Sequence, residues 1–477
     1  MIFFAGANAP VVRRETLEDL TDRVRKSGGK SLRLCLHDHV PVSADDGLAW
    51  TRWLEALRSS DIANISVDFE EGNTQEEEQM VSSHQILQSL VANLSNLRVL
   101  KLSGYCQSTG MPLTELTNLL KTGGAAALTH LHLTSVKMDV KDIQSFSLAL
   151  AEHASLTELR LQDCQLHLAN TADGLDSDEF LYHLLEGVSA APNLKSLLIS
   201  PTKRQALGTI SVRAIERLQS ANNHLTSLIL YPIHGFFTTS GGAMSPFQAL
   251  TSLLASNQIP TLKQLHLPFC ADNQKQCHDI ASLLTSKTSL GSLDLMGTSH
   301  QDMMDLEQQL RQEQEQQHQQ QQHEDTHDHH HPLLQIAHAL SGSSLQSIAL
   351  TGFGTTGIPF HVVQAFAQTV QLNYGIQQML LYDIQTTVLR KTVDYHCHLN
   401  QQGRKRWLQH MYANNKPKRR QEFCKAQDGM EQKSTQSQQR MLFRLAQDKD
   451  ALYYYLSHMN PSFLEHQSKQ ANKCHQK

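Results

Sequence analysis

The residues of this sequence best suited to chemistry are histidines that lie beside acidic residues. Six of them fall in the Gln-rich stretch "EQQLRQEQEQQHQQQQHEDTHDHHHP", residues 307–332. On a helix, His323, His327 and His331 would share one face, and neutral imidazoles bind zinc, copper or nickel. A polar low-complexity tract of this kind also favours disorder over a packed structure. We expect only adventitious metal binding here, and predict neither a metal site nor a cofactor.

A second histidine pair has strand-like spacing. His130 and His132 are two residues apart, so they would lie on the same face of a strand, and Glu158 could supply a third ligand. Zinc sites need three or four fixed donors, and the spacing does not indicate how Glu158 would be placed. We therefore expect exposed histidines rather than a metal centre.

Motifs typical of common enzymes are missing from the sequence. It contains no GxSxG, no GxxxxGK[ST] and no HExxH. Eight cysteines are spread between Cys35 and Cys474 without a CxxC pair, which is typical of reduced thiols inside a cell. No catalytic residue is predicted.

A short phrase recurs along the chain, as in "LTHLHL", "LTELRL", "LTSLIL" and "LKQLHL". Its first, fourth and sixth positions are apolar, and the fourth and sixth would face the same side of a short strand. Degenerate copies begin at Ile62 and lie within "SLRLCL", where Leu34 and Leu36 are taken as the anchors. The first positions of the other copies are Leu97, Leu128, Leu156, Leu194, Leu225, Leu262, Leu290, Leu345 and Ile376.

Stretches with helical periodicity separate these phrases, and each has apolar residues at i, i+3, i+4 and i+7. Strand and helix alternate roughly every 30 residues, and no single unit can bury its own apolar face. Stacking the units would give a continuous core and a parallel sheet. The helical stretches include residues 48–60, 81–94, 143–154, 180–191, 212–221, 280–290 and 362–370.

The recurring phrase resembles leucine-rich repeats, specifically the ribonuclease-inhibitor-like class with a helix in every repeat. The resemblance implies an α/β solenoid with a curved parallel inner sheet and outer helices. We expect a cap at residues 1–30, about eleven repeats at 31–385 and a helical C-terminal region at 386–477. Cys164 and Cys270 follow the last strand leucine of their phrases, where the family places a buried Asn or Cys at the turn.

One spacing locates an insertion. Successive phrases lie 28 to 38 residues apart, but Leu290 and Leu345 are separated by 55 residues. The excess over a 28-residue repeat nearly equals the Gln/His tract, and the pattern resumes in frame with "PLLQIAHALSGSSLQSIAL". Residues 307–331 are therefore predicted to be a low-complexity insertion that the solenoid tolerates.

The C-terminal region is basic, whereas the rest of the chain is acidic. Residues 386–477 hold 17 Lys and Arg against 7 Asp and Glu, which leaves 24 against 39 elsewhere. The phrases "HLNQQGRKRWL" and "ALYYYLSHMNPSF" resemble the tail of uncharacterised microalgal leucine-rich-repeat proteins. That resemblance implies kinship and carries no biochemical role.

Residues between the phrase leucines are predicted to face away from the core on the inner sheet. In ribonuclease-inhibitor-like proteins this concave surface binds other proteins, so we expect a protein partner here. The candidate contact residues are Lys101, Ser103, His130, His132, Glu158, Arg160, Gln162, Tyr231, His266, Asp294 and Tyr382.

Charge and hydropathy also bear on location and partners. No apolar run approaches the roughly 18 residues of a membrane span, so no membrane association is expected. The run "KPKRR", Lys416 to Arg420, has the composition of a nuclear-import signal, but a solvated basic loop is the simpler interpretation. We expect a cytoplasmic monomer, with nuclear import as an alternative, and no nucleic-acid partner.

The predicted function is a non-enzymatic scaffold for protein–protein interaction, and two alternatives remain. The RanGAP family shares this repeat class and activates a GTPase through an arginine and an asparagine, but no motif here matches theirs. A ubiquitin-ligase adaptor would carry an F-box of about 40 to 50 residues, and the 30 residues before the repeats are too few.

Overall fold

The computed structural model describes segments of the chain between residues 16 and 401. The predicted insertion lies outside them except for His331, and so do Tyr382 and the basic run 416–420. The described residues are 16–27, 31–37, 39–41, 48–70, 80–104, 111–121, 126–139, 143–167, 178–201, 207–219, 224–233, 235–237, 244–271, 273–286, 288–297, 331–351, 358–381, 393–394, 396–397 and 400–401.

Eleven of the described strands form one sheet in which every neighbouring pair is parallel. Consecutive repeats supply neighbouring strands of this sheet, so it grows in chain order, and each connection between them crosses over through a helix. The strands are β1 (Ser31–His37), β3 (Asn64–Glu70), β5 (Val99–Ser103), β7 (His130–Thr134), β9 (Glu158–Gln162), β11 (Ser196–Ser200), β12 (Ser227–Leu230), β13 (Gln264–Phe269), β14 (Ser292–Gly297), β15 (Ser347–Thr351) and β16 (Gln378–Leu381).

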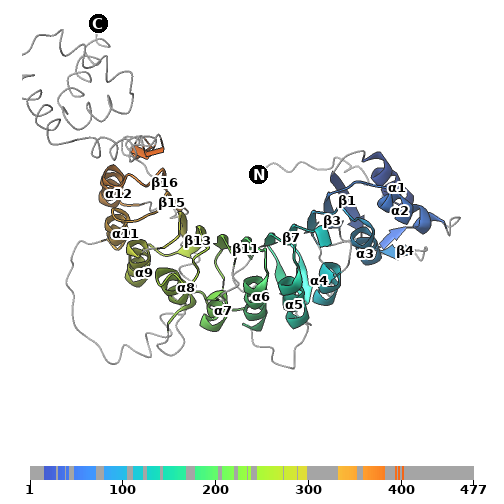
Figure 1. Cartoon of the computed structure of the whole chain (residues 1–477), viewed down its shortest axis with the longest axis horizontal. Coiled ribbons are helices and arrows are strands. Elements are labelled where there is room, and N and C mark those ends of the chain that lie inside the picture. The colour runs from blue at the N-terminus through green and yellow to red at the C-terminus, as the bar shows by residue number, and fades with distance from the viewer. Residues whose placement is uncertain are drawn as a thin grey trace, which may run out of the picture.

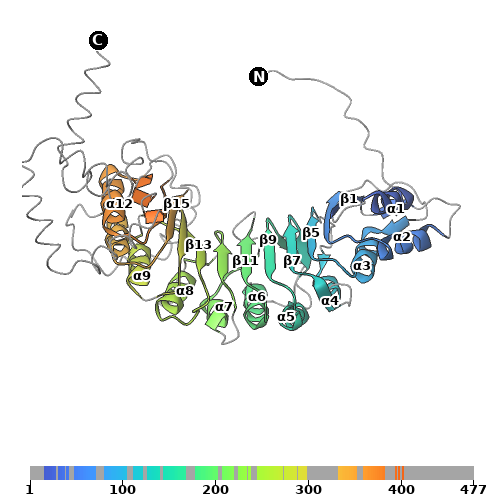
Figure 2. The same ribbon diagram turned by 45° about the horizontal axis from the view of Figure 1, so that its top comes forward.

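Helices cover one side of this sheet. Figures 1 and 2 show an arc with the strands along its inner side and the helices along its outer side. The helices are α1 (Leu17–Lys26), α2 (Ala49–Arg58), α3 (Ser83–Asn93), α4 (Leu113–Lys121), α5 (Ile143–Glu152), α6 (Glu179–Ala190), α7 (Val212–Glu216), α8 (Pro246–Ala255), α9 (Gln274–Thr285), α11 (Leu333–Leu340) and α12 (Phe360–Leu372), and a 3-10 turn, η2 (Arg217–Gln219), follows α7. The fold is the predicted α/β leucine-rich-repeat solenoid.

Short strands connect some inner strands to the following helices. In the described segments, β6 (Met111–Pro112), β8 (Lys137–Asp139) and β10 (Gln165–His167) form a three-stranded parallel sheet of their own. Near the N-terminal end, β2 (His39–Pro41) pairs with β4 (Met80–Ser82) in antiparallel fashion. These pairings hold successive strand-to-helix connections side by side.

The phrase leucines form the core, as their spacing predicted. In the β7 repeat, Leu128, Leu131 and Leu133 are fully buried, and the same three positions are buried in the repeats on either side. Removing this apolar surface from water is the main stabilising contribution to such a fold. The side chains between the leucines face the inner side of the arc.

The register corrects the assignment of the first repeat. The sequence predicts Leu34 and Leu36 as the anchors of this copy, but Leu32 aligns with Ile65 and Leu34 with Val67. All three leucines are buried. An alternating pattern repeats every two residues, so it cannot by itself distinguish two registers that differ by two.

The cysteines predicted at the turns are buried. Cys164 is 0% exposed, and its Sγ–H donates to the carbonyl oxygen of Leu133 at 3.4 Å. Burial raises the pKa of this thiol to about 12, which keeps it protonated. Cys270 is also buried, and its backbone N–H donates to Oε1 of Gln276 at 2.9 Å. Both cysteines are therefore buried structural residues at the turns that follow their strands.

Two further observations concern the ends of the described region. Helix α1 precedes the first inner strand and packs against α2, while Val393, Cys397 and Asn400 are buried beyond β16. Within the described residues, no helix is long and apolar enough to cross a membrane. The domain bounds at 30, 307, 331 and 385 stay predictions.

Candidate protein-binding face

The inner strands carry an aligned row of side chains, here called the central row. Each member lies between two buried residues of its own strand, so it points away from the helices. Neighbouring members lie on strands about 4.8 Å apart. In strand order the central row is Arg33, Ser66, Lys101, His132, Arg160, Leu198, Ile229, His266, Asp294, Ala349 and Leu380.

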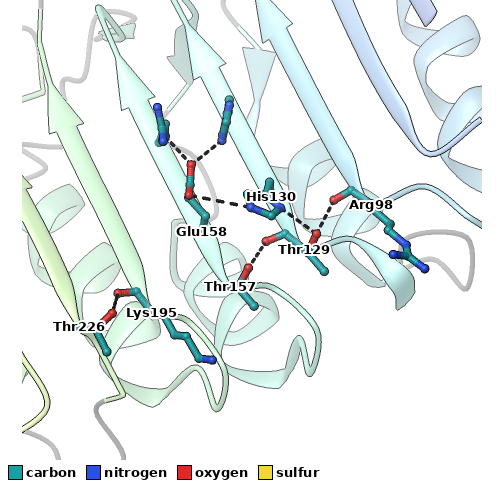
Figure 3. A network of polar contacts seen from close by, with 9 residues as sticks. Arg98, Thr129, His130, Thr157, Glu158, Lys195 and Thr226 are labelled. Atoms are coloured by element: carbon teal, nitrogen blue, oxygen red, sulfur yellow. Dashed lines mark hydrogen bonds and ion pairs between the residues drawn. The ribbon is translucent and has the colours of Figure 1, made fainter. Parts of the chain in front are cut away.

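Hydroxyl groups strengthen the joints between repeats that carry this row. Thr129 Oγ1 donates to the carbonyl oxygen of Arg98 at 3.0 Å, and that oxygen also accepts backbone N–H groups from the next repeat. Thr157 Oγ1 donates to the carbonyl oxygen of Thr129 at 2.9 Å, and Thr226 Oγ1 donates to the carbonyl oxygen of Lys195 at 3.0 Å (Figure 3). Thr129, Thr157 and Thr226 each stand at the second position of their phrase. A threonine at this position thus adds a hydrogen bond from its side chain to the backbone of the preceding repeat.

Glu158 lies at the centre of a polar cluster of four residues on β7 and β9, the Glu158 cluster. Its Oε1 accepts a hydrogen bond from Nε of Arg160 and lies 2.8 Å from Nε2 of His132. Its Oε2 lies 3.9 Å from Nε2 of His130, toward which it points in Figure 3. Strand register produces the arrangement, because His130 pairs with Glu158 and His132 with Arg160.

Partial burial decides the protonation of the Glu158 cluster. Burial lowers the pKa of His132, and the hydrogen bond with Glu158 opposes this only in part. Burial also favours a higher pKa for Glu158, but bonds and charge from Arg160 and His132 outweigh it and the pKa is lowered. Near pH 7 the cluster therefore holds an ionised carboxylate, a guanidinium and a neutral His132. A neutral His132 donates through Nε2, since a carboxylate only accepts.

The two histidines are not arranged as a metal centre. Their rings meet edge to face with centroids 6.1 Å apart, and Nε2 of His132 is bonded to Glu158. In the segments that the structure describes, no three His, Cys, Asp or Glu side chains converge on a point where a metal ion could bind. The histidines are half-buried rather than freely exposed, because they pack against each other and against Glu158.

A second ion pair joins β13 and β14. Nδ1 of His266 lies 3.0 Å from Oδ2 of Asp294, and the two residues are register partners. The other carboxylate oxygen, Oδ1, is buried and has no hydrogen-bond partner among the described residues. The pair separates two apolar stretches of the central row.

The apolar members of the central row begin directly beside Arg160. Leu198 and Ile229 are partly exposed on β11 and β12, and Tyr231, two residues after Ile229, is 39% exposed. Beyond the His266–Asp294 pair the row is apolar again at Ala349 and at Leu380, which is 36% exposed. The inner face is therefore divided into a charged part and apolar parts.

Comparisons with known proteins add little to this description. No family model and no curated protein matches the chain. An internalin from Listeria monocytogenes is similar to it at a TM-score of 0.27 and 13% identity, over 71% of this chain and 86% of that chain. The fold assignment rests on the sheet itself.

The structure places most of the predicted contact residues on the inner face. Arg160 and Gln162 are exposed there, as is Lys101 one strand beyond His132, while Tyr382 lies outside the described residues. Leu198, Ile229 and Arg33 were missed. The two apolar residues occupy the fifth position of their phrases, as Lys101 does, and reading that position in every repeat would have found them.

Of the six histidines in the Gln/His tract, His331 lies within the described residues. Its Nδ1 accepts the backbone N–H of Leu333 at 3.3 Å, at the start of α11, and its ring centroid lies 6.2 Å from that of His361. This contact gives His331 a structural role at a helix N-terminus. The prediction about metal binding by the tract stays a prediction.

Proposed function

We propose that this chain is a non-enzymatic scaffold of the ribonuclease-inhibitor-like class that binds a protein partner on the inner face of its sheet. The observation that carries the proposal is the central row. Its side chains stand on a continuous sheet, so a partner would meet groups that are already held in place and would lose little conformational freedom on binding. We further propose that the chain acts as a cytoplasmic monomer.

The composition of the row supports a protein rather than a small molecule. Polar and charged stretches of the row are followed by apolar ones along eleven strands, from Arg33 to Leu380. Protein interfaces commonly combine apolar contacts with a polar surround, and extended inner surfaces suit them. The exposed Tyr231 belongs to a residue type that is enriched at such interfaces.

The experiment is affinity capture from cells with matched variants. Wild-type protein should retain a specific partner, and the charge reversals K101E, R160E and D294K should each reduce its recovery. The control K195E changes an exposed lysine outside the central row and should retain the partner. If all four variants recovered the same amount of partner, the proposal would be wrong. GTP turnover of small GTPases, stimulated by the wild type, would instead favour the activator alternative.

A further inference from the structure

The described side chains of the inner face from β1 to β9 include more cations than carboxylates. Lys101 and Arg160 belong to the central row, and Glu158 lies two residues before Arg160 on β9. On β3, the carboxylate of Asp68 is bonded to Arg33. Glu158 is already shared by Arg160 and His132. Within the described part of the chain, Lys101 makes no ion pair and its side chain is exposed. Among the described residues, one positive charge is therefore left without an ion-pair partner on β5, the third strand of the sheet.

The spacing of these groups suits an incoming carboxylate. Lys101, His132 and Arg160 are consecutive in the central row, so the two cations stand two strands apart, or roughly 10 Å. A carboxylate held above His132 would lie within reach of both long side chains, and charge-assisted hydrogen bonds of this kind are the stronger ones. Arg160 keeps part of its guanidinium free, since its side chain is 46% exposed.

Apolar groups begin on the next strand. Leu198 is the register partner of Arg160, Ile229 is that of Leu198, and Tyr231 extends the apolar area just past the end of β12. A ligand that crosses the strands would therefore meet charge first and apolar surface second. The distance from Lys101 to Ile229 is four strand steps, about 19 Å. About six residues of extended chain or about thirteen of helix would span it.

We infer that the partner presents an acidic stretch followed or preceded by apolar side chains, with the acidic part over Lys101, His132 and Arg160 and the apolar part over Leu198, Ile229 and Tyr231. This inference rests on the proposed function and specifies its ligand. A nucleic acid is disfavoured, because its regularly spaced phosphates would continue from the charged part across the apolar surface of Leu198 and Ile229.

Selection from a random 12-residue peptide library displayed on phage tests the inference with a defined probe. On wild-type protein, the enriched peptides should combine two or more Asp or Glu with at least two large apolar residues. Synthetic copies should bind more weakly as NaCl rises from 50 to 500 mM, since the charged contacts are screened. A single-stranded oligonucleotide that bound more tightly than every selected peptide would overturn the inference.

Variants test the charged part and the apolar part of the proposed binding surface separately. K101E leaves the Glu158 cluster intact and should weaken an enriched acidic peptide about tenfold. I229S should weaken it by a similar factor through the apolar half, while the double control K195E/K263E should bind like wild type. Thermal melting of each variant checks that it folds.

The outcomes separate the two proposals. Enriched peptides that respond to I229S but carry no acidic excess, or that bind K101E as well as wild type, would overturn the acidic assignment and leave the inner face as a binding surface. If no enriched peptide responds to any change on the central row, both the inference and the proposed binding face are wrong.

Discussion

Nε2 of His132 lies 2.8 Å from Oε1 of Glu158, and this contact joins β7 to β9 through their side chains. The same carboxylate oxygen accepts a bond from Arg160, so two residues on neighbouring strands depend on one acceptor atom. In an exposed setting such pairs contribute little, but the side chains of His132 and Glu158 are each 17% exposed. Because the two side chains are largely shielded from water, protonation of His132 should change the stability of the fold.

The first prediction follows from the lowered pKa of His132. Burial lowers this pKa below the ordinary value of 6.5, so at lower pH the unfolded chain takes up the proton more readily than the folded one. The free energy of unfolding should then fall as pH drops through 6.5. In H132Q this contribution is absent, so urea midpoints at pH 8 and pH 5.5 should differ less than in wild type. An equal or larger difference in H132Q would contradict the assignment.

The second prediction concerns the threonine bonds between repeats. T157V removes the hydroxyl that donates to the carbonyl of Thr129 and should cost about 1 kcal/mol of unfolding free energy. T157S keeps a hydroxyl and is the matched control, with a loss of under about half that value. Urea titration measures both. If the two variants were equally stable, the hydroxyl would make no net contribution.

The third prediction uses the close packing of α5 against α6. A Cβ at Gly187 would lie 2.6 Å from the backbone oxygen of Ser147, a distance that only movement of the helices can relieve. G187A should therefore lower the unfolding free energy by about 1 to 3 kcal/mol. At Gly342, nothing lies within 4 Å of an added Cβ, so G342A should be neutral or slightly stabilising. A neutral G187A would show that the helices adjust without cost.

The fourth prediction concerns the buried Asn400. Its Nδ2 donates to the carbonyl oxygens of Asn373 at 3.0 Å and Ile376 at 2.7 Å. N400A removes two hydrogen bonds from a buried position, at a cost of about 2 kcal/mol or more. Hydrogen exchange should accelerate in α12 and β16 while β5 to β9 stay protected, because repeats interact mainly with their neighbours. Q401A, which removes an exposed bond to Gln377, should have little effect. Uniform acceleration across the sheet would contradict this local role.

The repeat pattern predicted the strands, the buried leucines and the orientation of the residues between them. These follow from periodicity alone, since alternate residues of a strand face opposite sides. Leu34 and Leu36 were predicted as anchors in place of Leu32 and Leu34, because two registers that differ by two residues have the same pattern. Pairing with β3, which involves residues some 33 positions away, selects one of them.

The candidate site was only partly predictable. His132, Glu158 and Arg160 were each placed on the inner face from sequence, but their sharing of one carboxylate depends on strand register and side-chain rotamers. Leu198 and Ile229 were not predicted, because an apolar residue between two phrase leucines has the same appearance in the sequence as a core residue. In a binding surface, partly exposed apolar residues at those positions are equally informative.

The amide of Gln401 donates to the carbonyl oxygen of Gln377 at 2.8 Å, whereas one repeat earlier the matching oxygen, on Gln346, accepts backbone N–H groups of Gln377 and Gln378. A stack of parallel strands has no inherent length, and an uncovered last strand would invite the first strand of another copy. Such head-to-tail contacts do not close on themselves, so they produce filaments. Among the described residues, Asn400 and Gln401 occupy the carbonyl oxygens of Asn373, Ile376 and Gln377, just before β16. These acceptors are therefore closed to a strand from another copy.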